Sequence, residues 1–209
     1  WDAFERLAEH LKALGFARPE AHHFVSPEGA EVDLLPYGEG VVANDTIVWP
    51  DGTVMSALGM EEAFAASVER EVAPGLSVRV VTAPALVVMK IVAYQERPHE
   101  RGKDVADVVE VFERYEEDDG RRFELIGATV DDAPIAFEEA GAYLVGVDAA
   151  RLARPKSREV IRAFLTGFTD EYAEPLSRVL AEEKRVHSED RRVQVYRLFR
   201  VFMAGFESL

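Results

Sequence analysis

Residues 84–94 form an apolar run that a single charge, Lys90, interrupts. Pro84 opens the run, where a proline fits the first turn of a helix, and Pro98 follows it, where a proline ends one. A helix that is apolar nearly all round has to be covered by other elements. The sequence therefore predicts a buried helix, and Lys90 needs either an anionic partner or a route by which its stem reaches solvent.

A second helix is expected at residues 103–115, after a polar loop that contains Arg101 and Gly102. Two carboxylates, Asp104 and Asp107, lie three residues apart in its first turns. The helix dipole favours a negative charge in the first turn and so explains an aspartate at position 104. It explains Asp107 less well, because that residue lies one turn further into the helix, where aspartate is a poor helix former. We expect an ion pair from Asp104 or Asp107 back to Lys90 or Arg97 on the preceding helix. The apolar side of the second helix is Val105, Val108, Val109 and Phe112.

The preceding helix offers a basic stripe to such an ion pair. Helical spacing puts Lys90, Tyr94 and Arg97 on one side at i, i+4 and i+7. An anion is the natural partner of such a stripe. The competing interpretation is a lysine whose stem covers apolar surface while its charge reaches water.

A third candidate site lies in a hairpin formed by residues 22–26 and 31–35, with a Pro-Glu-Gly turn between them. Asp33 lies within the second strand. Aspartate is disfavoured in strands and costly to bury alone, so we expect it to have a cation, a metal or backbone donors as a partner, or to lie on an exposed strand face. His22 and His23 are adjacent and point to opposite faces of a strand, so a zinc site is not expected.

The remaining pattern is that of an α+β protein. The acidic stretch 116–119 marks the expected boundary between an N-terminal domain, 1–116, and a mostly helical C-terminal domain, 117–209. Further helices are expected at 1–14, 60–68, 135–143, 157–168, 175–186 and 193–206, and further strands at 46–49 and 77–81.

Charge and composition exclude several classes of function. The chain has 24 basic and 39 acidic residues, a net charge of −15, and no cysteine, which excludes disulfides and thiolate chemistry. Residues 1–150 carry 12 − 30 = −18 and residues 151–209 carry 12 − 9 = +3. Such an acidic first part disfavours nonspecific nucleic-acid binding. No membrane-spanning run or secretory signal is visible, so a cytoplasmic protein without a membrane partner is expected. No phosphate-binding P-loop, dinucleotide fingerprint or serine nucleophile elbow occurs.

The order of these motifs resembles the nucleotidyltransferase family that includes AbiEii-like toxins of bacterial toxin–antitoxin and abortive-infection systems. The resemblance covers residues 1–116, and its most specific parts are Lys90-Ile91-Val92-Ala93-Tyr94 and Lys103-Asp104-Val105-Ala106-Asp107. It implies a polymerase-beta-like core, a mixed sheet with flanking helices, followed by a helical domain.

The resemblance also implies the site. Asp33 matches the third metal-binding acid, Lys90 the lysine that faces the nucleotide, and Asp104 a catalytic acid. Tyr94, Arg97, Lys103 and Asp107 would line the nucleotide pocket. The implied substrate is an NTP with Mg²⁺ as cofactor, because paired acids in this chemistry hold metal ions that activate the acceptor and stabilise the leaving pyrophosphate.

The chain departs from the family pattern in one respect. The Gly-Ser turn and the Asp-x-Asp pair that precede the first helix in this family do not occur in the 209 residues, and we expect them upstream of Trp1. Two interpretations stay open: an enzyme, or a catalytically inactive binding or regulatory module. The implied partners are an RNA or protein acceptor and an antitoxin or regulatory protein. A basic segment could serve an acceptor or be ordinary surface charge: Arg151, Arg154, Lys156, Arg158 and Arg162.

Overall fold

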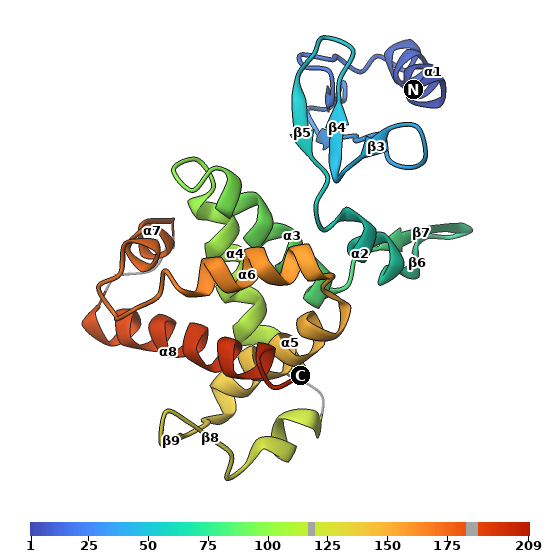
Figure 1. Cartoon of the computed structure of the whole chain (residues 1–209). Helices are drawn as coiled ribbons and strands as arrows, with labels where there is room; N and C mark the ends of the chain where they lie inside the picture. Colours follow the sequence, from blue (N-terminus) through green and yellow to red (C-terminus); the bar gives the residue numbers. More distant parts are fainter. Residues whose placement is uncertain (117–119, 183–187) are drawn as a thin grey trace. The chain divides into compact units, whose positions relative to one another are not determined.

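A computed structural model of the chain describes residues 1–116, 120–182 and 188–209 (Figure 1). The α+β class is confirmed, with helices dominating and short strands between them. A mixed sheet was expected, but every strand pair within the described residues is antiparallel. The chain separates into two compact units, Trp1–Ala57 and Leu58–Leu209.

The first unit packs one helix with two small sheets around a cluster of aromatic rings. The ring of Trp49 lies 5.3 Å from that of Trp1 and 5.6 Å from that of Phe4, both in edge contact. Phe24 and Ile47 complete this core and are almost fully buried. The elements of this unit are α1 (Asp2–Ala13), β1 (His23–Val25), β2 (Glu31–Asp33), β3 (Val42–Ala43), β4 (Thr46–Val48) and β5 (Val54–Ser56).

The predicted elements of this unit are confirmed, although each is shorter than expected. The N-terminal helix ends just before Gly15, whose φ of +91° is the left-handed conformation that favours glycine after a helix. The expected hairpin is present, with Phe24 opposite Val32. The sequence missed β3 and β5, which flank β4 in a three-stranded sheet.

The second unit is a helical assembly that carries two small hairpins. Figure 1 shows α5 and α8 lying side by side along its core, in agreement with their contacts. Its elements are α2 (Met60–Ala65), β6 (Val68–Ala73), β7 (Leu76–Val80), α3 (Ala83–Glu96), α4 (Gly102–Arg114), a 3₁₀ helix η1 (Gly120–Leu125), β8 (Thr129–Val130), β9 (Ala133–Pro134), α5 (Phe137–Leu152), α6 (Pro155–Leu165), α7 (Glu174–Glu182) and α8 (Glu189–Phe206).

Helix α3 is buried, as its apolar run predicts. Val87, Val88 and Ile91 are completely inaccessible to solvent, and α3 packs against α4, α5 and α6. The predicted apolar side of α4 is buried in the same core. The last part of the helix expected at 175–186 and most of the expected linker at 116–119 lie outside the described residues.

The division into compact units falls at a different place from the boundary that the sequence suggested. Helices α3 and α4 share one hydrophobic core with α5, α6, α7 and α8, so they pack with the C-terminal helices. The physical reason is that α3 has no polar face, and the C-terminal helices supply the apolar surfaces that cover it.

A buried carboxylate joins α2 to the start of α6. Glu62 is 5% exposed, and its Oε1 accepts hydrogen bonds from Ser157 Oγ at 2.5 Å and from the backbone N–H of Arg154 at 3.2 Å. Arg154 is the N-cap residue of α6 and Ser157 lies in its first turn, where backbone N–H groups lack helical partners and the dipole favours a negative charge. Glu62 therefore caps α6 from a distant part of the chain.

Two glycines allow α5 and α8 to approach closely. A Cβ atom built on Gly205 of α8 would overlap the carbonyl oxygen of Tyr143, and one built on Gly146 of α5 would overlap that of Phe202. The two backbones are thus in direct contact at this crossing, and a side chain at either position would force the helices apart.

We predict that Gly205→Ala lowers the free energy of unfolding by about 1–3 kcal/mol, although alanine is the better helix former, because the methyl group meets backbone rather than a movable side chain. Urea denaturation followed by circular dichroism measures this. Gly120→Ala is the matched control, since no atom of the described residues lies within 4 Å of its added methyl. Equal stability of the two variants would contradict the close approach.

Candidate functional site

Lys90 joins α3 to the start of α4 through two ion pairs. Its Nζ donates to Asp104 Oδ1 at 2.9 Å and to Asp107 Oδ2 at 2.7 Å. The side chains of Lys90 and Asp104 are 19% and 16% exposed, and that of Asp107 is 36% exposed. The ion pair expected from the spacing of the aspartates is therefore present, and both aspartates take part in it.

Asp104 has an oxygen that is buried without a hydrogen bond. No donor within the described part of the chain bonds to its Oδ2; Nη1 of Arg101 lies 3.7 Å away, beyond hydrogen-bond distance. The four charges of Lys90, Arg101, Asp104 and Asp107 sum to zero. The cluster is locally neutral, yet it retains an oxygen with unused hydrogen-bonding capacity.

The electrostatics of Lys90 favour its charged form. Burial by itself would lower the pKa of Lys90, but the hydrogen bonds to Asp107 and Asp104 outweigh burial, so the pKa lies above its ordinary value. Lys90 is therefore positively charged at neutral pH. Its ammonium is held in place by hydrogen bonds to two carboxylates, and its backbone belongs to the buried helix α3.

The other members of the expected basic stripe do not converge on Lys90. Tyr94 is 3% exposed and packs in the core with its ring 5.6 Å from that of Phe164. The Arg97 side chain is 53% exposed and pairs with Glu100, while Lys103 is exposed on α4. Of the nucleotide-pocket residues that the resemblance implies, the structure brings Asp107 to Lys90.

Asp33 belongs to the first unit and has a partner there. Its Oδ1 lies 2.7 Å from Nδ1 of His23, directly across the hairpin, and its side chain is 63% exposed. The hydrogen bond to Asp33 raises the pKa of His23. The partner expected for Asp33 is the imidazole of His23, and Asp33 lies on an exposed strand face.

A groove runs along α3 and α4 from the Lys90 cluster. Its volume is about 450 Å³; Ala83, Leu86 and Val111 form its apolar part, and Glu110 lies beside them in the lining. Lys90 and Asp107 line one end, and Arg114, Tyr115 and Glu116 line the other. Volumes of this size are typical of small-molecule sites with an apolar lining and a few polar groups. The Lys90 cluster is thus one end of a larger concave site.

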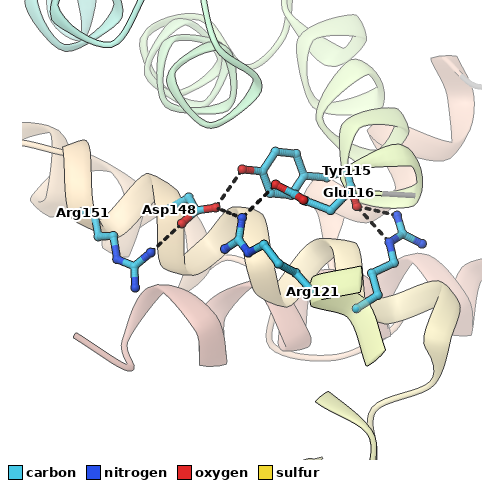
Figure 2. A network of polar contacts seen from close by, with 6 residues as sticks. Tyr115, Glu116, Arg121, Asp148 and Arg151 are labelled. Atoms are coloured by element: carbon cyan, nitrogen blue, oxygen red, sulfur yellow. Dashed lines mark hydrogen bonds and ion pairs between the residues drawn. The ribbon is translucent and has the colours of Figure 1, made fainter. Parts of the chain in front are cut away.

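The far end of the groove adjoins a polar network that the sequence did not indicate. Figure 2 shows Asp148 at its centre: Oδ2 accepts from Tyr115 Oη at 2.7 Å and from Arg121 at 2.9 Å, and Oδ1 accepts from Arg151 at 2.9 Å. Arg121 also donates to Glu116 at 2.8 Å. Burial and the hydrogen bond to Asp148 raise the pKa of Tyr115 well above its ordinary value. The network fixes the position of Tyr115 where it meets the groove.

The carboxylates present do not by themselves form a metal centre. Within residues 1–116, 120–182 and 188–209, no group of three or more His, Cys, Asp or Glu side chains is arranged to hold a metal ion. Asp104 and Asp107 are bound to Lys90, and Asp33 to His23. The two-metal arrangement implied by the resemblance is therefore not assembled by these residues.

The basic segment after residue 150 is engaged in internal contacts. Arg151 pairs with Asp148, Arg154 with Glu61 and Arg162 with Glu207. Arg158 donates to the carbonyl oxygens of Ala150 and Ala153 at the end of α5. These contacts agree with the interpretation of the segment as surface charge.

No family model, curated protein or solved structure matches the chain. None of the helices in the described ranges has the length and apolar character needed to cross a membrane.

We predict that Lys90→Met lowers the free energy of unfolding by about 1–3 kcal/mol at pH 7, because two half-buried carboxylates then lose the cation between them and only Arg101, 3.7 Å from Asp104, remains nearby. The stabilisation by Lys90 should be complete below the ordinary lysine pKa of about 10.4 and lost as the pH rises through its higher folded value. Urea denaturation at several pH values measures this.

The control for Lys90 is Arg97→Met, which removes an exposed ion pair and should cost well under about 1 kcal/mol. Adding Asp107→Asn to Lys90→Met should restore part of the stability, because it removes one of the two facing negative charges. A loss of the same size in Arg97→Met and Lys90→Met would contradict the assignment.

We predict that Tyr115→Phe destabilises the protein by about 1–2 kcal/mol at neutral pH by removing one donor from Asp148. This difference should shrink above about pH 10, the ordinary tyrosine pKa, because only the unfolded wild-type chain ionises Tyr115 there and wild-type stability falls. Denaturant unfolding at neutral and alkaline pH compares the two proteins. A difference that stays constant or grows with pH would contradict the raised pKa.

Proposed function

We propose that this protein is an NTP- and Mg²⁺-dependent nucleotidyltransferase in which Lys90 binds the phosphate groups of the nucleotide. The observation that carries the proposal is the Lys90 ammonium, held by Asp104 and Asp107 at one end of a groove of small-molecule size. Nucleotidyl transfer proceeds mainly by positioning and charge neutralisation, so a fixed cation in a concave site is the group that this chemistry needs.

The geometry suits a phosphate ligand. An ammonium donates three hydrogen bonds; the two aspartates accept two, and no acceptor among the described residues takes the third. The site is locally neutral, so it does not repel an NTP that arrives as its Mg²⁺ complex, in which the metal offsets part of the phosphate charge. The Mg²⁺ is in this view a part of the substrate.

The other roles follow from the resemblance in residues 84–115 and 31–36. Asp33 would serve acceptor activation, Asp104 with Lys103 would shape the nucleotide pocket, and the acceptor would be an RNA or a protein. A toxin role, with an antitoxin as partner, belongs to the same resemblance.

A second candidate function is a nucleotide-binding regulatory module without catalysis. It is favoured by the state of the three candidate acids: Asp104 and Asp107 bind Lys90, and Asp33 binds His23. Among the described residues no group of acids and histidines is arranged to hold a metal ion. Such a module would bind NTP and transfer nothing.

The test is a transfer assay with the full-length protein, Mg²⁺, each labelled NTP and a mixture of total RNA and protein. We predict that label is transferred, that Lys90→Ala and Asp33→Ala abolish transfer, and that Lys12→Ala, a change at an exposed lysine of α1, leaves it at the wild-type rate. Asp33→Ala is informative because its exposed side chain is not needed for packing.

Wild-type transfer rates in both the Lys90 and the Asp33 variants would contradict the site. NTP binding without any transfer by the wild-type protein would replace the transferase by the regulatory module.

A further inference from the structure

We propose that the groove between α3 and α4 is the nucleoside subsite of this protein: the base and sugar of an NTP lie on Leu86 and Val111, while its phosphates meet Lys90. The inference rests on the proposed function, which identifies the ligand's anionic end as the triphosphate of an NTP. It adds where the protein binds the sugar and base of that NTP, and by which side chains.

The first argument is the direction of the groove. Lys90 meets Asp107 across the two antiparallel helices, and the lining continues along α4 from Asp107 to Arg114 and Tyr115. At about 1.5 Å of rise per residue this is roughly 10 Å of helix. A ligand anchored at Lys90 by its phosphates therefore has a continuous concave path in which to place a sugar and a planar ring.

The second argument is the chemistry of the lining. Between Asp107 and Arg114 the lining combines apolar side chains, of which Leu86 and Val111 are only partly buried by the protein itself, with Glu110, whose carboxylate pairs with Arg114. Leu86 lies one helical turn before Lys90 on the same side of α3. An apolar floor beside a fixed cation fits a ligand with an anionic head and a flat ring, because base faces gain from leaving water while phosphates do not.

The third argument concerns the side chains at the end of the groove that lies away from Lys90. Arg114 is 70% exposed and pairs with Glu110 at 3.2 Å, so its planar guanidinium stands at the rim of the groove. Arginine stacks on ring faces and donates in a planar fork. Tyr115, held by Asp148, forms a rigid wall beside it. These are groups that can contact the face and polar edge of a base.

The experiment compares the binding of Mg²⁺-NTP with that of Mg²⁺-tripolyphosphate to the full chain by isothermal titration calorimetry. A nucleoside subsite makes the best-bound NTP at least about tenfold tighter than tripolyphosphate. Leu86→Trp fills the floor and should weaken the NTP to the level of tripolyphosphate while leaving tripolyphosphate unchanged. Ala83→Trp, at a half-exposed position at the start of α3, fills the same groove should Leu86→Trp not fold.

Val193→Trp is the matched control, because it adds the same ring at a half-exposed position of α8 outside the groove, and it should change neither affinity. Equal affinity for NTP and tripolyphosphate, absence of NTP binding, or an unchanged NTP affinity in the folded Trp variants would each overturn the inference.

The transfer assay on the same preparations separates this inference from the proposed function. The predicted binding pattern without label transfer would support the subsite and refute the transferase. Label transfer with an unchanged KM for NTP in Leu86→Trp would support the transferase and refute the subsite.

Discussion

The packing of α3 against α4 in the second unit depends on one interaction: the charge of Lys90, on an otherwise apolar helix, needs anionic partners. A lysine in this place can be tolerated only if carboxylates meet it, and Asp104 and Asp107 do so from the first two turns of α4. The pairing fixes α4 against α3. It also holds the ammonium of Lys90 at one end of the groove. The ion pairs that fix the two helices against each other therefore also position the charged group of the candidate site.

The opposite end of α4 is fixed by a second cation. Arg122 is 3% exposed and donates to the carbonyl oxygens of Glu113 and Tyr115, where the helix leaves carbonyl groups without partners. A glycine at position 141 makes room, because a Cβ there would lie 2.6 Å from Nη2 of Arg122. Helix α4 is thus held by charge at both ends and by its apolar side between them, which makes it a rigid wall for the groove.

The sequence predicted what is determined locally. The apolar run of α3, the apolar side of α4 and the Lys90 ion pair follow from spacing within a short stretch of chain, and all three are present. It did not predict the contacts between distant segments, such as Tyr115 with Asp148 or Glu62 with Ser157, 33 and 95 residues apart. Helical periodicity also placed Tyr94 beside Lys90, whereas the burial of α3 on several sides directs Tyr94 into the core. The groove could not be foreseen, because it depends on how two helices pack.

The most direct test of the account is a nuclear magnetic resonance titration of the isotope-labelled full chain with the Mg²⁺ complex of its best-bound NTP. The account predicts that the largest changes in amide shifts fall along the groove, around Leu86, Lys90, Asp107 and Val111, and that tripolyphosphate reproduces only those at the Lys90 end. Shifts that are confined to other parts of the chain, or a groove that does not respond to either ligand, would contradict it.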